Sequence, residues 1–250
     1  MSKKTNYSYV GIAFIILVFG IIFIPRIVDR ISKDDIIRDE SRSEEVNKVD
    51  FVMKEASDLM FIEINGKPKK APAFKFVNQN GDTITNQDYQ GKVYVVDFFF
   101  TTCPTICPRM SRNLVEIQDK FNDFENFGVA SFTINPQYDT SEVLKKYADN
   151  YGVTNPNWHL MTGAEKDLLD LANIGFTIYA GKNLQAEGGI EHSGNFALVD
   201  KNGYLRSRTD DFGNPRIYYK GIISVAEGEE DGEKEEISIL KEDISKLLKE

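Results

Sequence analysis

The pattern of apolar and polar positions divides the chain into an apolar N-terminal segment, a charged stretch and a long region in which apolar runs alternate with turns. Residues 7–25 carry no charged side chain and approach the roughly 20 apolar residues that cross a bilayer core. They predict a transmembrane anchor, preceded by a cytoplasmic tail (1–6) and followed by a charged linker (26–58) and one globular domain (59–250). A cleavable signal peptide is the alternative, but no small-x-small cleavage site follows the apolar run.

The orientation of this anchor does not follow from basic residues alone. Basic residues lie on both sides of the segment: Lys3 and Lys4 before it, and Arg26, Arg30 and Lys33 after it. The positive-inside rule therefore does not determine which end of the segment faces the cytoplasm. A short tail before a first hydrophobic segment usually stays in the cytoplasm when a large domain is exported. We therefore expect a single-pass protein of the inner membrane, with its C-terminal domain on the extracytoplasmic, periplasmic side.

Within the domain, the first strong signal is a buried strand that runs directly into a helix. Val93–Phe100 is rich in β-branched and aromatic residues, which is typical of a strand buried on both faces. The apolar residues that follow recur at helical spacing, at Ile106, Met110, Leu114 and Ile117. This pattern predicts a central strand and a helix joined by a short connection.

The other predicted elements continue the alternation of strands and helices. They are a turn at Asn78–Thr83, a strand at Val129–Ile134, helices at Ser141–Asn150 and Leu168–Ile174, a hairpin of Asn195–Asp200 with Tyr204–Arg206, and a terminal amphipathic helix at Ile237–Leu248. This order predicts an α/β, thioredoxin-like fold in which helices flank a central mixed sheet.

Charge narrows the range of partners. The chain has 30 basic and 39 acidic residues and a net charge of −9, so its surface would repel nucleic acid and anionic lipid headgroups. The most biased stretch is Glu227–Glu236, which we expect to be a solvated, flexible loop. A docking patch for a partner is the alternative.

The candidate chemistry lies in the two cysteines, Cys103 and Cys107, just after the buried strand. Pro104 fits the first position of a helix, which predicts Cys103 as the cap, with its sulfur at a helix N-terminus that favours the thiolate. Residues four apart on a helix share a face with Cα atoms about 6 Å apart, so the pair can form a disulfide or hold a soft metal ion. Buried cysteines acting as small apolar residues are the alternative.

Only two histidines can complete such a site. His159 lies in a strand-like piece, and we expect it to be a packing or surface residue. His192 lies in a glycine-flanked loop before the Asn195–Asp200 strand, where a mobile loop could bring its ring to the thiols. We interpret His192 as a ligand, with a surface residue as the alternative. Two thiolates favour Cu(I), and an added imidazole favours Cu(II).

These residues resemble the Sco/SenC family of membrane-anchored copper proteins over residues 71–200. Phe100–Pro108 is similar to that family's signature, a Cys-x-x-x-Cys-Pro after a Phe-rich strand. Ile134–Thr140 is similar to its second motif, and Glu191–Ser193 to its histidine-bearing loop. The acidic stretch looks like an addition to the family pattern, and Asn135 stands where the family often has an aspartate.

The resemblance implies a thioredoxin-like fold with a copper ion, Cu(I) or Cu(II), held by Cys103, Cys107 and His192. It implies a metallochaperone role in cytochrome c oxidase assembly, in which the partner is the copper-accepting subunit of a haem-copper oxidase with a binuclear copper centre. Asp139 carries over as an acidic residue near the site. Its alternative interpretation is the N-cap of the Ser141 helix.

The competing function is that of an enzyme, a thiol–disulfide oxidoreductase in which Cys103 attacks and Cys107 resolves. Ordinary thioredoxin-like reductases have Cys-x-x-Cys and a proline opposite the thiols, whereas this chain has one more residue between its cysteines and no proline between Pro156 and Pro215. A peroxidase of peroxiredoxin type is disfavoured, because its upstream proline is missing from Val95–Thr102. Copper delivery and thiol reduction do not exclude each other.

Overall fold

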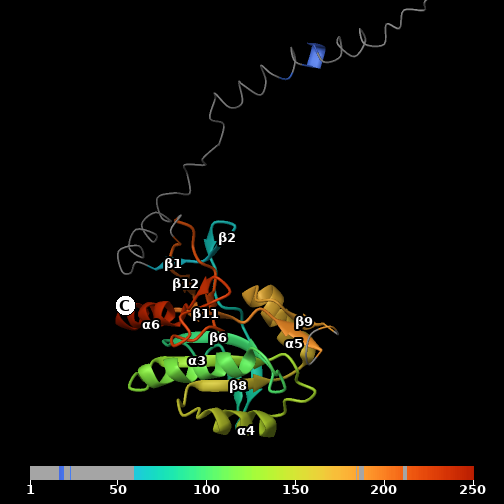
Figure 1. The fold of residues 1–250 in the computed structure, drawn as a ribbon, viewed down its shortest axis with the longest axis vertical. Coiled ribbons are helices and arrows are strands. Elements are labelled where there is room, and N and C mark those ends of the chain that lie inside the picture. Colours follow the sequence, from blue (N-terminus) through green and yellow to red (C-terminus); the bar gives the residue numbers. More distant parts are fainter. Residues whose placement is uncertain (1–16, 20–22, 24–58, 184, 186–188, 211–212) are drawn as a thin grey trace, which may run out of the picture. The chain divides into compact units, whose positions relative to one another are not determined.

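A computed structural model of the chain describes residues 17–19, 23, 59–183, 185, 189–210 and 213–250 (Figure 1). The chain divides into two compact units, Met1–Val52 and Met53–Glu250. In the first unit the described residues are helical, and the rings of Phe19 and Phe23 stack with their centroids 4.1 Å apart.

The predicted N-terminal regions fall almost entirely outside the described residues. Of the predicted anchor over 7–25, only residues 17–19 and 23 are described, and the tail (1–6) and linker (26–58) lie outside. Among the residues that the structure describes, no helix has the length and apolar character needed to cross a membrane. The anchor therefore stays a prediction.

The second unit is built on a central mixed sheet, as predicted. In the described part of the chain this sheet has nine strands in the order β1-β12-β11-β6-β7-β8-β4-β5, with β13 pairing β11. The pairs β6–β7 and β7–β8 are parallel, and the other pairs are antiparallel. The strands are β1 (Met60–Phe61), β4 (Lys75–Asn78), β5 (Thr83–Thr85), β6 (Val93–Phe99), β7 (Phe127–Thr133), β8 (Trp158–Thr162), β11 (Asn195–Val199), β12 (Leu205–Ser207) and β13 (Tyr219–Lys220).

The helices lie between strands along the chain, with a last helix after the final strand, which confirms the predicted alternation of strands and helices. They are α3 (Cys107–Lys120), α4 (Ser141–Tyr151), α5 (Glu165–Asp170), the π-helix η2 (Leu171–Phe176) and α6 (Ile237–Lys249). The start of α4 is capped, because the Thr140 hydroxyl accepts the Val143 N–H at 3.3 Å. Its end is set by Gly152, which has a φ of 78° that favours glycine.

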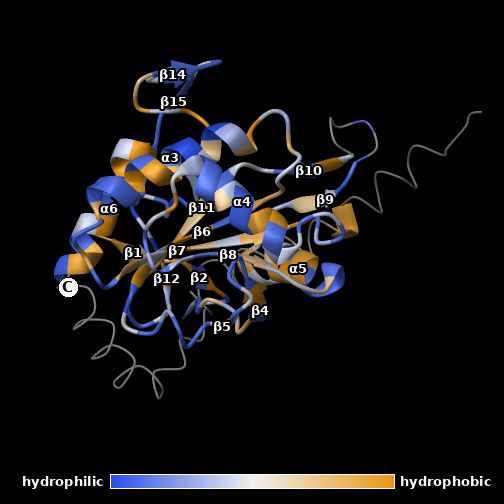
Figure 2. Ribbon diagram, turned by 90° about the horizontal axis from the view of Figure 1, so that it is seen from below, coloured by the Kyte–Doolittle hydropathy of each residue, from blue (hydrophilic) through white to orange (hydrophobic). Residues whose placement is uncertain are grey.

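The two faces of the sheet carry different layers. Successive residues of β6 point to opposite sides, so Asp97 and Phe99 face α3 and α4. Phe98 faces the other side, where its ring lies 5.5 Å from that of Phe132 and 6.0 Å from that of Phe176 in η2. Figure 2 shows α6, α3 and α4 on one side of the sheet, with hydrophobic strands beneath them.

Three small hairpins complete the domain. They are β2 (Glu63–Ile64) with β3 (Lys67–Pro68), β9 (Ala180–Lys182) with β10 (Ile190–His192), and β14 (Glu229–Glu230) with β15 (Glu233–Lys234). The last one corrects the prediction of a flexible loop at Glu227–Glu236. Asp231 and Gly232 both have positive φ, at 51° and 79°, and Asp-Gly is a favoured pair for a two-residue hairpin turn.

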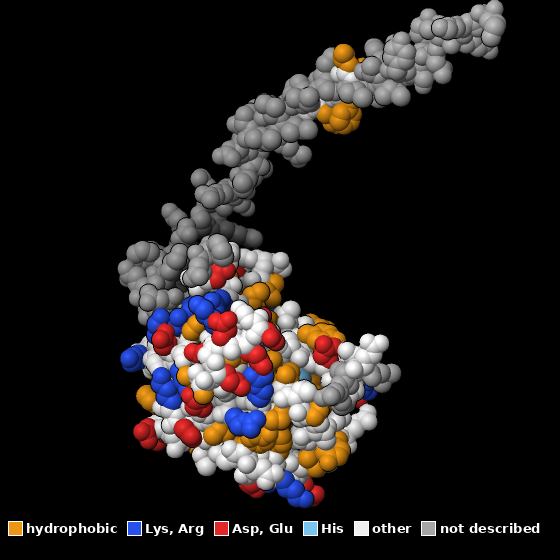
Figure 3. Space-filling view, viewed as in Figure 1, with side chains coloured by type: hydrophobic (Ala, Val, Ile, Leu, Met, Phe, Trp, Pro, Cys, Tyr) orange, Lys and Arg blue, Asp and Glu red, His pale blue; other side chains and the backbone are white. Residues whose placement is uncertain are grey.

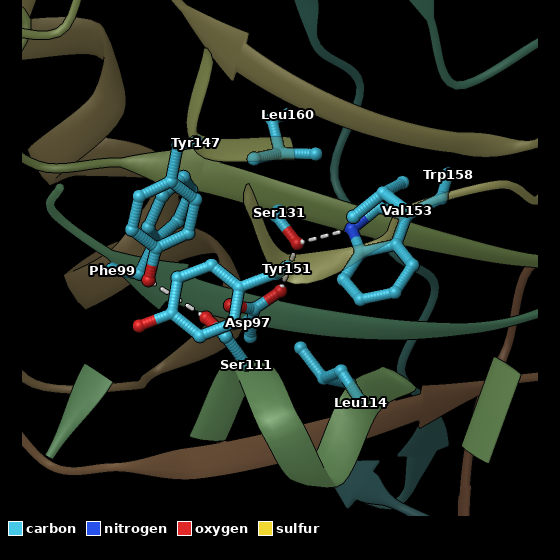
Figure 4. A pocket seen from close by; sticks show the side chains of 10 residues that line it. All are labelled: Asp97, Phe99, Ser111, Leu114, Ser131, Tyr147, Tyr151, Val153, Trp158 and Leu160. Carbon is cyan, nitrogen blue, oxygen red and sulfur yellow. Dashed lines mark hydrogen bonds between the residues drawn. The ribbon is translucent and has the colours of Figure 1, made fainter. Parts of the chain in front are cut away.

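A buried carboxyl group lies between the sheet and its helices (Figure 4). Asp97 is 3% exposed and accepts a hydrogen bond from the Ser131 hydroxyl, which itself accepts the Trp158 ring N–H at 3.0 Å. Burial raises the pKa of Asp97 to about 7. A cavity of about 10 Å³ adjoins it, close to the volume of one water molecule.

We predict that Asp97 makes the domain less stable as the pH rises from about 4 to about 7. The folded pKa is above the unfolded one, so the folded state binds an extra proton in this range, and ionisation at higher pH costs on the order of 4 kcal/mol. The Asp97→Asn side chain still accepts the hydrogen bond from the Ser131 hydroxyl. Because its amide does not ionise, the variant should not lose stability over this pH range. Urea unfolding at both ends of the range measures the change.

The exposed Asp123→Asn variant is the control for Asp97→Asn and should keep the pH dependence of the wild type. The interpretation is wrong if Asp97→Asn and wild type lose the same unfolding free energy between the two pH values.

Candidate metal centre

Three buried side chains converge where β6 leads into α3. Cys103 lies in the connection between these elements, Cys107 is the first residue of α3, and His192 is the last residue of β10. Their exposed fractions are 7%, 1% and 6%, and their ligand atoms all lie within 4.8 Å of one another. The structure therefore brings together the three residues predicted as ligands.

The start of α3 differs from the prediction. The helix begins at Cys107 with Ile106 at the cap, so Cys103 is not the cap and Pro104 is not in the first turn. In a helix begun at Pro104, Pro108 would fall where its ring meets the preceding turn and its missing N–H breaks the backbone ladder. Pro108 instead occupies the first turn, where it is tolerated.

The Cys103 sulfur still reaches the helix N-terminus. The backbone N–H of Cys107 points at Cys103 Sγ, with 3.5 Å between N and S, and Thr105 Oγ1 lies 3.7 Å from the same sulfur. A hydrogen bond from Cys103 N to Phe100 O, at 3.2 Å, closes the connection into a turn. Turn geometry rather than helical spacing therefore brings the two cysteines together.

The two thiols have opposite electrostatic environments. The hydrogen bond from the Cys107 thiol, helped by those from His192 and from the Cys107 backbone, lowers the pKa of Cys103 to about 3. Burial raises the pKa of Cys107, and the neighbouring Cys103 thiolate raises it further. The pair is therefore one thiolate and one thiol, and neither cysteine is in a disulfide.

His192 is held in a strand rather than in the mobile loop that was predicted. Its backbone pairs with Ala180 of β9, and its Nε2 lies 3.1 Å from Cys107 Sγ. The ring also meets that of Phe100 edge-on, with 6.0 Å between centroids. No swing of the backbone is needed, because the imidazole is already beside the thiol.

Gly194 fixes the turn between His192 and β11. Its φ is 67°, and a Cβ at this position would lie 2.5 Å from the side chain of Ile222. Both the conformation and the close approach require glycine. The side chain of Ile106, the cap of α3, also lies beside this position, so apolar groups cover the edge of the centre.

Asp139 lies outside the group of three residues and is hydrogen-bonded to the segment that carries Cys103. It is fully buried and accepts the backbone N–H of Thr101 at 3.1 Å and the hydroxyls of Thr101 and Thr133. It thereby ties the end of β7 to the segment that carries Cys103. Its alternative interpretation as the α4 cap is wrong, because Thr140 is the cap.

His159 lies apart from the centre, as expected for a packing residue. It is in β8, half-buried, and its Nδ1 lies 3.2 Å from Asn78 Nδ2. Sequence reasoning missed the supporting roles of Phe100, Thr101 and Thr133. Phe100 and Thr101 have a local signal, since they lie within three residues of Cys103. The contact of Thr133 with Asp139 has no such signal, because neither residue is near a cysteine in the sequence.

The fold and the site define a class of protein. A thioredoxin-like domain with two thiols and an imidazole converging after a central strand can bind a soft metal ion or exchange disulfides. The SCO1/SenC family model matches residues 63–227. The chain belongs to the SCO1/SenC family.

Known relatives agree with this assignment. The chain is 34% identical over 154 residues to the SCO1 protein homolog of Bacillus subtilis, a match that covers 60% of this chain and 78% of that protein. A SCO1/SenC family lipoprotein from Bacillus anthracis is similar in structure, with a TM-score of 0.59, 26% identity, and coverage of 72% and 95%. BsSco, with 24% identity and a TM-score of 0.57 over 72% of this chain and 94% of that one, has the same fold.

We predict that the cysteine pair ionises in two widely separated steps. Cys103 should be a thiolate from about pH 3 upward, while Cys107 keeps its proton beyond neutral pH. Cys107→Ala removes the main donor and should raise the pKa of Cys103, whereas Cys107→Ser retains a hydroxyl donor and should raise it less. The ultraviolet absorbance of the thiolate, followed against pH, measures both steps.

Cys103→Ser is the control for this titration, because it should abolish the acidic step altogether. Two steps that overlap near the ordinary cysteine pKa in the wild type would contradict the asymmetry.

Proposed function

We propose that this chain is a membrane-anchored, extracytoplasmic protein that binds a copper ion through Cys103, Cys107 and His192. The observation that carries the proposal is the convergence of their ligand atoms within 4.8 Å in a buried site. Two sulfurs and one imidazole nitrogen fit the donor preferences of Cu(I) and Cu(II). Metal ligation requires the deprotonated thiolate, so copper binding releases the proton of Cys107.

The proposed destination of the copper is the binuclear copper site of a haem-copper oxidase. Membership of the SCO1/SenC family supports it, and BsSco is described as a member of the Sco family of cytochrome c oxidase assembly proteins. The partner would be the copper-accepting subunit, which receives the metal or has its thiols reduced. Asp139 would act as a positioning residue, since it fixes the segment that carries Cys103.

The second candidate function is thiol–disulfide exchange on exported proteins. The asymmetry of the pair favours it, because Cys103 is a thiolate and Cys107 a protected thiol. The Cys103 thiolate would attack a target disulfide and form a mixed disulfide, and one target sulfur would leave as a thiolate. Cys107, once deprotonated, would then attack Cys103, release the second target thiolate and leave a Cys103–Cys107 disulfide.

We predict that His192→Ala weakens Cu(II) binding by at least about tenfold and removes the thiolate-to-copper absorption band, with a smaller effect on Cu(I). The wild-type full chain should bind one equivalent of copper. His159→Ala is the matched control, because it removes the other histidine and should leave copper binding unchanged. Titration of the reduced wild type and of both variants with Cu(I) and with Cu(II) measures the affinity and the number of copper ions bound.

The outcome also separates the two candidate functions. Absence of copper binding by the wild type would rule out the copper proposal. If oxidase assembly in cells survives His192→Ala but fails with Cys103→Ser, thiol exchange is the function.

The membrane anchor is a proposal that rests on the apolar run over residues 7–25. We predict that the chain stays in membranes under alkaline carbonate extraction and that protease added from the extracytoplasmic side digests the domain. Arginines at Leu17 and Phe19, each costing about 3 kcal/mol at the centre of a span, should release the chain from the membrane. Ser8→Arg, near the edge, is the control. A wild-type chain that is extracted, or a domain that resists protease in intact cells, would contradict the proposal.

A further inference from the structure

A groove of about 310 Å³ is lined in part by the residues that follow His192 in the chain. One wall is the turn Ser193–Asn195, which begins immediately after the ligand His192. The other wall is the hairpin β14–β15, through Glu230, Asp231 and Glu233. The side chains of Lys220, Ile222 and Ile223 complete the lining. The three proposed ligands do not line the groove, but the residue that follows His192 in the chain does.

The hairpin is attached to the helix that carries the ligand Cys107. Arg109, two residues further along α3, places its Nη2 2.7 Å from Glu230 Oε2 and 3.1 Å from Glu227 Oε2. Lys220 of β13 pairs with Glu233 of β15. These contacts place the acidic hairpin beside the centre, although residues 227–236 share no sheet with the core strands.

The hairpin has more negative charge than its own stability favours. Residues 227–236 include seven acidic residues and one basic residue. Glu230 and Glu233 lie directly opposite each other in the β14–β15 register, an arrangement that is destabilising for like charges. On the face drawn in Figure 3, acidic and basic side chains are interspersed. Such breaks in local preference are expected at functional sites.

A second, independent feature lies on the opposite wall of the groove. The hydroxyl oxygen of Ser193 is buried and has no hydrogen-bond partner among the residues that the structure describes. Leaving a buried hydroxyl unpaired is destabilising, because the group has lost its hydrogen bonds to water. A polar group that enters the groove can supply the missing hydrogen bond once the Ser193 side chain rotates toward it.

We propose that this groove and the hairpin β14–β15 dock a cationic segment of the protein that exchanges copper or electrons with the centre. The inference rests on the proposed function, because it describes the partner of that same site. Charge complementarity selects the occupant: the groove has three carboxylates, of Glu230, Asp231 and Glu233, against the single cation Lys220, and Asp231 has no ion pair among the described residues, so lysine and arginine are attracted. Ile222 and Ile223 provide apolar contact. Nucleic acid and anionic membranes are repelled by the same charges.

The test uses the full chain and a synthetic dodecapeptide, (Lys-Gly-Ser)₄, that carries a nitroxide spin label. In wild type the peptide should bind and broaden the amide resonances of Ser193, Gly194 and Asp231. Binding should weaken as ionic strength rises from about 0.01 M to about 0.15 M, because the Debye length falls from about 30 Å to about 8 Å. The corresponding (Glu-Gly-Ser)₄ peptide should not bind.

The decisive variant is Asp231→Asn with Glu233→Gln, which removes two charges from the groove and keeps the positive φ of residue 231 accessible. The matched control is Asp123→Asn with Glu125→Gln, which removes two exposed charges of the same spacing beyond the far end of α3, about 20 Å away. We expect the groove variant to bind the lysine peptide at least about fivefold more weakly, and the control to bind it like wild type.

The outcomes distinguish this inference from the proposed function. No peptide binding by wild type, or equal weakening in both variants, overturns the docking surface. Copper titration of the groove variant should match wild type, because no ligand is changed. Failure of wild type to bind copper would overturn the proposed function and leave the peptide result to be judged separately.

Discussion

The grouping of Cys103, Cys107 and His192 depends on the antiparallel pairing of β6 with β11. Ala197 pairs with Val96 and Leu198 with Val95, so the end of β6 and the beginning of β11 lie at the same edge of the sheet. β6 leads to the two cysteines, and β11 is preceded by His192. Residues 85 positions apart in the chain therefore meet, with Cys107 Sγ 3.1 Å from His192 Nε2. A slip of one residue between these strands would shift the imidazole by about 3.3 Å and turn alternate side chains to the wrong face.

The sequence was sufficient for the parts of the site that carry a local signal. The apolar run of β6 and the helical spacing of α3 placed the cysteines at a junction, and the scarcity of cysteine and histidine restricted the possible ligands. The glycines around His192 distinguished it from His159, which lies in β8 and is hydrogen-bonded to Asn78. The strand pairing that unites the three residues is a long-range property with no equivalent pattern in the sequence.

Where the predictions were wrong, a competing local rule decided the structure. Pro104 and Pro108 both suit the first turn of a helix, but only a start near Cys107 keeps Pro108 out of the helix interior. Asp139 and Thr140 both suit an N-cap, and Thr140 takes the role because Asp139 accepts hydrogen bonds from Thr101 and Thr133. Asp231 and Gly232 have the positive φ angles of a two-residue hairpin turn, so residues 227–236 form a hairpin despite their high content of charged residues.

The proton on Cys107 must be lost before the two cysteines can bind copper or form a disulfide. Two thiolates in so buried a site would leave two negative charges without compensation, so the metal-free pair keeps one proton. A bound Cu(II) ion would replace that proton and neutralise both thiolates, and a bound Cu(I) ion would leave a combined charge of −1, which equals that of the singly protonated pair. A disulfide also removes both charges, through a covalent bond. Loss of the Cys107 proton is therefore favoured only when a metal ion or a disulfide bond compensates the charge that it leaves. The imidazole of His192, with Nε2 3.1 Å from Cys107 Sγ, would add a nitrogen ligand for the metal.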